Sequence, residues 1–162
     1  MPKVAVSIIN YRTAEMTLAA IGSVLADFRH GRDGRPIAGE IVVIDNASGD
    51  GSAEAIEGWI AAHPQAPVRL VRSPVNSGFS GGHNQGIAQT ASDYVLLLNS
   101  DAELRPGCLA ALLDMAEAEP GAGLLGPTLE GEDGTRQTSF FRCPTALSEI
   151  GRGAASGPVA KA

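Results

Sequence analysis

The chain has 162 residues, of which 44% are hydrophobic and 19% charged, and these values are typical of one ordinary globular domain. The formal net charge is −6, from 18 acidic and 12 basic residues, which argues against sequence-independent binding to nucleic acid or to an anionic membrane. A phosphorylated small molecule is not excluded, because it needs only a local cradle.

Short apolar runs alternate with amphipathic stretches along most of the chain. The β-branched run at residues 4–9 predicts a buried strand. Thr13 is in place to cap the helix that follows, in which apolar residues recur every fourth position from Met16 to Phe28. The alternation continues with strands at 40–44, 68–71 and 94–98 and with helices that begin at Ser52, near residues 84–90 and at Pro106. This order predicts an α/β domain with a mostly parallel sheet.

The C-terminal part of the sequence has weaker patterns. A further strand is predicted at residues 123–129, and the Asp-Gly pair at 133–134 predicts a hairpin that joins it to a strand at 138–141. The last residues, 151–162, are rich in Gly, Ala, Ser and Pro. We therefore expect one domain over residues 1–150 and a flexible tail over 151–162.

Polar residues follow each predicted strand at its carboxyl end. In parallel sheets ligands bind at this edge, so these residues are the first candidates for a site. They are Asn10 and Tyr11 after the first strand, Asp45, Asn46, Ala47 and Ser48 after the second, Asn76, Ser77 and Gly78 after the third, and Asn99, Ser100 and Asp101 after the fourth. One such strand end means little, but four together indicate a site.

Asn99, Ser100 and Asp101 directly follow the most apolar run of the chain. Alternate residues of an extended segment share a face, so we expect Asn99 and Asp101 to point the same way. One carboxylate together with amide and phosphate oxygens suits Mg²⁺ or Mn²⁺. An Asx-type turn leading into the next helix explains the same residues without a ligand, and the sequence leaves both interpretations open.

Asp45 and Tyr11 each have two interpretations. The Asp45 carboxylate is suited to accept a hydrogen bond from a nucleobase or a ribose hydroxyl, or to act as a turn acid, since residues 45–52 are dense in turn-forming types. The Tyr11 ring is suited to stack on a base, which is worth about 1–3 kcal/mol, or to pack at the sheet edge.

Glycine and small polar residues dominate the segment 76–86 (NSGFSGGHNQG). They predict a glycine-rich turn that allows close backbone approach, followed by a helix N-terminus suited to an anion. The segment matches neither the dinucleotide fingerprint nor the P-loop. His83 has no visible acid or metal partner, so we expect a hydrogen-bonded loop histidine. No Gly-x-Ser-x-Gly motif occurs, and no nucleophile is predicted.

Four segments carry a resemblance when they are taken together. They are 6–11 (VSIINY), 41–52 (IVVIDNASGDGS), 76–87 (NSGFSGGHNQGI) and 94–101 (YVLLLNSD), with 126–127 (GP), 133–134 (DG) and 142–145 (RCPT) further on. In order and spacing they resemble the family 2 glycosyltransferases, in particular the bacterial rhamnosyltransferase-like branch. The resemblance covers about residues 3–150. It implies a GT-A-like (Rossmann-like) three-layer sandwich, truncated in its C-terminal half.

The resemblance implies transfer of a sugar, with inversion, from a UDP- or dTDP-linked donor to a saccharide or lipid-linked acceptor in cell-wall or polysaccharide biosynthesis. Tyr11 would lie against the base, and Asp45 would hydrogen-bond to it. Asp101 would contact Mg²⁺ or Mn²⁺, which would neutralise charge on the departing diphosphate, while Asn99 would turn toward the ribose. The implied nucleotide-sugar-binding residues are Asn10, Tyr11, Asp45, Asn76, Gly78, Asn84, Asn99 and Asp101.

The family also implies an acceptor-facing half whose Asp acts as general base. The acidic pair Glu132 and Asp133 precedes Gly134 in a predicted hairpin and lies too early to match, so no catalytic residue is assigned. The alternative function is a non-catalytic nucleotide-sugar-binding module or a remnant without the base. An unrelated doubly wound nucleotide binder is disfavoured because the glycine fingerprint is missing.

The remaining expectations concern location and assembly. Cys108 and Cys143 lack Cys-x-x-Cys spacing, which indicates a reducing compartment rather than a zinc site. The first apolar run is too short for a signal peptide or a membrane span. We expect a cytoplasmic chain, at most at the inner face of the membrane, with no nucleic-acid partner. An unpaired strand edge at 138–141 would favour a homodimer or aggregation.

Overall fold

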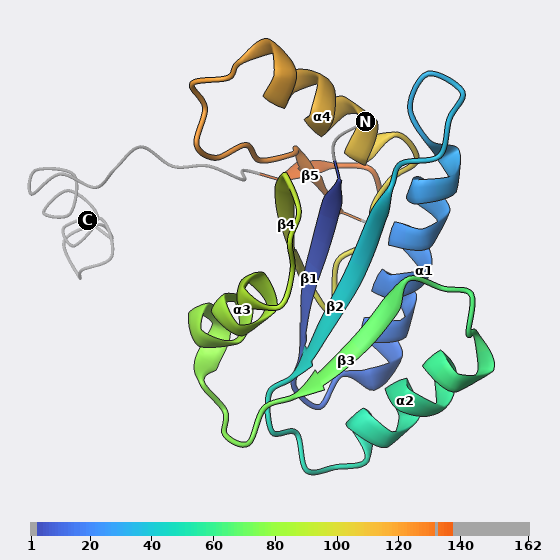
Figure 1. Ribbon diagram of the computed structural model, residues 1–162, viewed down its shortest axis with the longest axis vertical. Helices are drawn as coiled ribbons and strands as arrows, with labels where there is room; N and C mark the ends of the chain where they lie inside the picture. Colours follow the sequence, from blue (N-terminus) through green and yellow to red (C-terminus); the bar gives the residue numbers. More distant parts are fainter. Residues whose placement is uncertain (1–2, 132, 138–162) are drawn as a thin grey trace, which may run out of the picture. The chain divides into compact units, whose positions relative to one another are not determined.

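The computed structural model describes residues 3–131 and 133–137, and the chain divides into two compact units, Met1–Pro120 and Gly121–Ala162. The first unit alternates strands and helices throughout (Figure 1). Its elements are β1 (Val4–Asn10), α1 (Ala14–His30), β2 (Gly39–Asp45), α2 (Ser52–Ala62), β3 (Val68–Arg72), α3 (Gly78–Ala88), β4 (Tyr94–Asn99) and α4 (Cys108–Ala118).

The four strands of the first unit form one parallel sheet in the order β3-β2-β1-β4. This confirms the predicted α/β class with a parallel sheet. Asn10 pairs in register with Asp45 of β2, and Ile9 pairs with Asn99 of β4. The carboxyl ends of β1, β2 and β4 therefore lie side by side at one edge of the sheet.

Helices cover both faces of the sheet, which gives the predicted three layers (Figure 1). Ile8 of β1 and Ile41 of β2 are fully buried in a core with Ile21 and Val24 of α1. Leu109 of α4 joins the same core, so α4 lies on the α1 side. α3 contacts β1 and β2 on the opposite face. Burial of strands on both faces explains their near-continuous apolar runs.

α3 begins at Gly78, inside the segment that the sequence predicts to be a turn. Its glycines serve close packing instead. A Cβ added at Gly82 would lie 2.8 Å from Ile9 Cδ1, and one added at Gly86 would lie 2.3 Å from Ser7 Oγ. The helix therefore approaches β1 more closely than any larger residue would allow, and this packing outweighs the low helix propensity of glycine.

Two helix starts also differ from the sequence prediction. Thr13 is the N-cap residue of α1, but its side chain makes no capping hydrogen bond. α4 begins at Cys108, two residues after the predicted Pro106, and Asp27 of α1 caps it. The Asp27 carboxylate accepts hydrogen bonds from the backbone N–H of Gly107 at 2.5 Å and of Leu109 at 2.7 Å. A buried acid from another helix thus satisfies the first free amides of α4.

β4 leaves part of the α3 face of the sheet uncovered. Val95 and Leu97 pair in register with Ala5 and Ser7 of β1, so they share the face on which Ser7 contacts α3. Val95 is 37% exposed and Leu97 is 45% exposed. Within the first unit β4 is the edge strand of the sheet, so these two exposed apolar side chains lie at its edge.

The second unit contains an antiparallel hairpin of β5 (Leu129–Glu130) and β6 (Arg136–Gln137). Gly134 adopts a left-handed φ of 77°, as the predicted Asp-Gly turn requires. The strand predicted at 123–129 is found only at its last residue. The predicted strand at 138–141 and the tail at 151–162 lie outside the described residues. No helix within the described ranges is long and apolar enough to cross a membrane.

Candidate functional site

A cavity of about 420 Å³ lies at the carboxyl ends of β1 and β4. Its position follows from the strand order, because the chain leaves β1 toward β2 on one side while β4 lies on the other. Such a reversal of strand order opens a crevice at the sheet edge, where ligands of doubly wound sheets bind. The cavity is lined by five of the residues predicted to bind a nucleotide sugar, namely Tyr11, Asn76, Gly78, Asn99 and Asp101.

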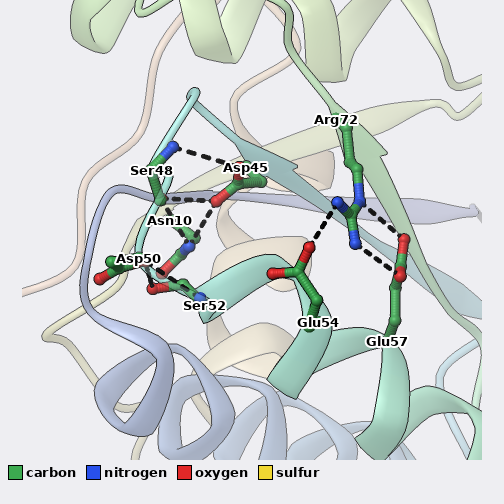
Figure 2. A network of polar contacts seen from close by, with 8 residues as sticks. All are labelled: Asn10, Asp45, Ser48, Asp50, Ser52, Glu54, Glu57 and Arg72. Carbon is green, nitrogen blue, oxygen red and sulfur yellow. Dashed lines mark hydrogen bonds and ion pairs between the residues drawn. The ribbon is translucent and has the colours of Figure 1, made fainter.

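Asp45 and Asn10 do not line the cavity but form a buried network beside it (Figure 2). Asp45 Oδ1 accepts hydrogen bonds from Asn10 Nδ2 at 2.7 Å and from Ser48 Oγ at 2.6 Å, and Asp45 Oδ2 accepts one from Ser48 N at 3.3 Å. Asp45 is 5% exposed. This geometry matches the turn-acid interpretation, while the contact between Asp45 and a base stays a prediction.

The Asn10 side chain joins three segments that meet at the sheet edge. Its Oδ1 accepts hydrogen bonds from Thr13 N at 3.2 Å and from Thr17 Oγ1 at 3.2 Å. Thr13 Oγ1 in turn donates to Ser100 Oγ at 3.1 Å, which reaches the loop after β4. The Thr13 hydroxyl therefore connects α1 to the Asn99–Asp101 segment instead of capping its own helix.

Asn46 is a strand-end candidate from the sequence that was not included among the nucleotide-sugar-binding residues, yet it lines the cavity. It is 3% exposed, and its Nδ2 donates to Asn76 Oδ1 at 3.0 Å while its Oδ1 accepts from Ser77 N at 3.0 Å. Asn76 Oδ1 also accepts from Gly78 N at 2.9 Å, so Asn76 holds the start of α3. Asn84 is exposed on α3 and does not join this group. The signal for Asn46 was its place directly after a buried strand.

Tyr11 lies at the rim of the cavity rather than packed at the sheet edge, and it is 42% exposed. Its neighbour Arg12 has a φ of 61°, in the left-handed region that favours glycine. This conformation lets Arg12 N donate to Ser48 Oγ and Arg12 Nε donate to Ser48 O, both at 3.1 Å. The Arg12 guanidinium then lies 5.1 Å from the centre of the Tyr11 ring. One face of that ring is thus held by a cation–π contact.

Asn99 and Asp101 both line the cavity and are exposed. Within the described ranges no cluster of three or more His, Cys, Asp or Glu residues is placed to hold a metal ion. Mg²⁺ commonly takes only one or two carboxylates from the protein and completes its shell with water and substrate phosphates. The donor set of one carboxylate and one amide fits that mode of binding and does not fit a closed, all-protein metal site.

His83 lies in α3, not in a loop, and it is 2% exposed. Its Nδ1 is 3.0 Å from Ser7 Oγ, and the Phe79 ring meets its ring edge-on with 4.5 Å between centroids. Burial lowers the pKa of His83, which favours the neutral imidazole. The expected hydrogen-bonded histidine is therefore found, but it also lines the cavity.

A second polar group joins β3 to α2 away from the cavity (Figure 2). Arg72 forms ion pairs with Glu54 at 2.8 Å and with Glu57 at 2.7 Å. All three side chains are largely exposed, so the pairs contribute little to stability. Nearby, hydrogen bonds from Ser52 lower the pKa of Asp50 at the start of α2. These contacts shape the fold rather than the site.

The family model described as "Glycosyl transferase family 2" matches residues 5–152. Among curated relatives, the N-acetylglucosaminyl-diphospho-decaprenol L-rhamnosyltransferase of Mycobacterium tuberculosis is 32% identical over 124 residues, which cover 70% of this chain and 38% of that protein. The succinoglycan biosynthesis protein ExoO of Rhizobium meliloti is 32% identical over 118 residues, 73% of this chain and 31% of that protein. This chain thus spans about a third of the length of these relatives.

Solved structures with the same fold include a mannosyltransferase, PcManGT of Pyrobaculum calidifontis, in complex with GDP-Man and Mn²⁺. Its TM-score is 0.62 at 24% identity, covering 71% of this chain and 32% of that one. The S. aureus TarS fragment 1–349 has a TM-score of 0.59 at 18% identity, covering 73% and 33%. The parallel α/β sheet with its crevice is therefore of the GT-A type. The chain belongs to glycosyl transferase family 2, as the four sequence segments indicated.

Proposed function

We propose that the first unit binds the nucleotide part of a UDP- or dTDP-linked sugar in the cavity at the ends of β1 and β4. The observation that carries this proposal is the convergence of Tyr11, Asn99 and Asp101 on one cavity at the reversal of strand order. An aromatic ring, an amide and a carboxylate are the groups that a base, a ribose and a cation-bound diphosphate need. Family membership supports the same substrate class.

In this proposal Tyr11 stacks its free face on the base, because Arg12 already occupies the other face. Asn99 hydrogen-bonds to the ribose. Asp45 hydrogen-bonds to the base through Oδ2. Among the described residues this oxygen accepts only one hydrogen bond, the long one of 3.3 Å from Ser48 N. The Asn10, Asp45 and Ser48 network keeps the loop after β2 in place while the base binds.

Asp101 is the residue proposed to hold Mg²⁺ or Mn²⁺ together with the diphosphate. The ion supplies charge neutralisation for the departing diphosphate. Asp101 carries no hydrogen bond or ion pair within residues 3–131 and 133–137, so its carboxylate needs no other partner to be released before it binds a cation. The hydrogen bond from Thr13 to Ser100 keeps the segment from Asn99 to Asp101 in position.

For the longer protein that the relatives represent, we propose sugar transfer with inversion to a saccharide or lipid-linked acceptor in cell-wall or polysaccharide synthesis. The names of the Mycobacterium tuberculosis and Rhizobium meliloti relatives support this assignment. No described residue is assigned as the general base. The second candidate function is a non-catalytic nucleotide-sugar-binding module, favoured by the same donor-side residues without such a base.

Calorimetry with UDP and dTDP tests the donor site. We expect binding that is tighter with Mn²⁺ or Mg²⁺ than with EDTA, and Asp101→Asn should remove most of the metal dependence while the fold is kept. Glu103→Gln is the matched control, because Glu103 is exposed, carries the same charge two positions on and does not line the cavity. Equal affinity with metal and with EDTA would exclude the metal assignment, and an unfolded Asp101→Asn would show a structural role.

Labelled UDP- and dTDP-sugars separate the enzyme from the module. The 162-residue chain should bind these sugars and hydrolyse them slowly at most, because departure of the diphosphate does not itself need the general base. Transfer to an acceptor should be detected only when a segment that supplies the base is added. General-base catalysis contributes about 10²–10⁴-fold in rate. Robust acceptor-dependent transfer by this chain would exclude the module and would place a base within it.

A further inference from the structure

His83 and Ser7 form a buried hydrogen-bonded pair, and the other ring nitrogen of His83 has no partner among the described residues. His83 is 2% exposed and Ser7 is 1% exposed, and Ser7 Oγ lies 3.0 Å from His83 Nδ1. His83 Nε2 is buried and has no hydrogen-bond partner within the described part of the chain. A buried polar atom without a hydrogen-bond partner destabilises a fold, so its presence in a residue that lines a cavity needs an explanation.

The hydrogen bonds of the described residues favour one tautomer of the His83 ring. Among the described residues the Ser7 hydroxyl has no side-chain partner other than His83, so the arrangement that satisfies its proton is donation to Nδ1. An Nδ1 that accepts is unprotonated, and in a neutral imidazole the proton is then on Nε2. Burial without a carboxylate partner keeps the ring neutral. Ser7 therefore turns Nε2 into an N–H donor.

The His83 side chain belongs to the lining of the proposed donor site. His83 lines the same cavity as Asn99 and Asp101, one turn of α3 after Phe79. The Phe79 ring contacts the His83 ring and is 57% exposed, so it shields the imidazole without being locked by packing. Rotation of an exposed side chain is fast, on the picosecond-to-nanosecond scale, so a ligand would reach the imidazole after Phe79 turns away from it.

We propose that His83 is a ligand-binding residue, whose Nε2–H donates a hydrogen bond to an acceptor oxygen of the nucleotide sugar, and that Ser7 is its positioning residue. The inference rests on the proposed function and adds a neutral donor to a cavity whose acidic group is Asp101. The shared chemistry of the acceptor is an oxygen with a free lone pair, supplied either by the base and ribose or by the diphosphate.

The close approach of α3 to β1 serves this pair. A side chain at Gly86 would meet Ser7 Oγ, and one at Gly82 would meet Ile9, so both glycines let the helix come near enough for His83 to reach Ser7. An apolar side chain at position 83 would fill the same space without an orphaned nitrogen. Packing alone does not explain why a hydroxyl and a histidine are buried together here, and this pairing points to a ligand.

The test combines binding with histidine NMR on the 162-residue chain. Calorimetry measures UDP, dTDP, uridine and thymidine against wild type, His83→Phe, His83→Gln and Ser7→Ala. We expect His83→Phe to weaken binding about tenfold, His83→Gln to stay within about threefold because it keeps an N–H donor, and Ser7→Ala to weaken binding about threefold. Loss in the nucleoside arm assigns the oxygen to base or ribose, and loss confined to the diphosphates assigns it to phosphate.

Nitrogen NMR reads the tautomer directly, with the His83 signals assigned by their loss in His83→Gln. The inference predicts an Nε2-protonated ring in the free chain and a shift of Nε2 when UDP or dTDP is added. Wild-type binding with His83→Phe within twofold, or an Nδ1-protonated ring, would overturn the inference and leave the proposed function standing. A wild type that binds none of the four compounds would overturn both. If His83→Phe does not fold, the Nε2 shift in wild type decides.

Discussion

The packing of α3 on β1 makes Gly86→Ala a severe substitution for its size. The added Cβ would lie 2.3 Å from Ser7 Oγ and 3.2 Å from Ser7 Cβ. Ser7 is in a central strand and 1% exposed, so it has no space to turn away and the helix must shift. Overpacking of a core costs about 1–3 kcal/mol, and the better helix propensity of alanine offsets about 1 kcal/mol. Because the 2.3 Å contact is severe, we place the overpacking cost at the upper end of that range and expect Gly86→Ala to lower the free energy of unfolding by about 2 kcal/mol.

Urea unfolding of matched variants measures this loss. Gly58→Ala in α2 is the control, because a Cβ there meets nothing within 4 Å, and it should stabilise the chain by about 0.5–1 kcal/mol. In the Ser7→Ala/Gly86→Ala double variant the hydroxyl clash is gone, so the two substitutions should couple favourably in a double-mutant cycle. A Gly86→Ala variant that gains stability as Gly58→Ala does, or additive effects in the cycle, would refute the close-packing account.

Three further predictions concern stability and assembly. Asp27→Ala leaves two backbone amides at the start of α4 without their acceptor, so it should lower the free energy of unfolding, measured in urea, by about 3 kcal/mol. A decrease below about 0.5 kcal/mol would contradict the capping role. Burial lowers the pKa of His83 below its ordinary 6.5, so the unfolded chain binds more protons than the folded chain as the pH falls through that value, and the free energy of unfolding decreases. His83→Phe should therefore flatten the plot of unfolding free energy against pH between about pH 7.5 and 5.5. An unchanged slope would contradict this prediction. Val95→Thr with Leu97→Thr should reduce self-association in light scattering at high concentration, and a monomeric wild type would contradict the importance of this exposed face.

The fold was predictable where burial alone determines the residue pattern. The runs that became β1 and β2 are apolar because helices cover both faces, and this pattern is visible in one sequence. The helix predicted near residues 84–90 begins earlier, at Gly78, and its start was misplaced because glycine both breaks helices and lets them approach a sheet. The spacing of Gly82 and Gly86, four residues apart, was the signal for a helix face with close packing.

The site was predictable only as far as strand ends allow. That rule brought Tyr11, Asn99 and Asp101 to one cavity. It cannot tell whether a polar side chain at a strand end faces a ligand or a neighbouring loop, and the partner of Asp45 is fixed by the register of β1 with β2. The sequence predicted His83 in a loop because it placed the start of the helix near residue 84, and it could not identify Ser7 as the partner because Ser7 lies in a different element. Contacts between distant segments determine these roles.

Amide chemical-shift mapping of the 162-residue chain during titration with UDP and dTDP, each with Mg²⁺, tests the central claim most directly. We predict that the perturbed amides cluster at Tyr11, at residues 99–101 and at the start of α3, around the cavity at the ends of β1 and β4. Signals of α4, which lies outside the cavity lining, should stay unchanged. Perturbations centred elsewhere, or none at millimolar nucleotide, would contradict a nucleotide-sugar site at this edge of the sheet.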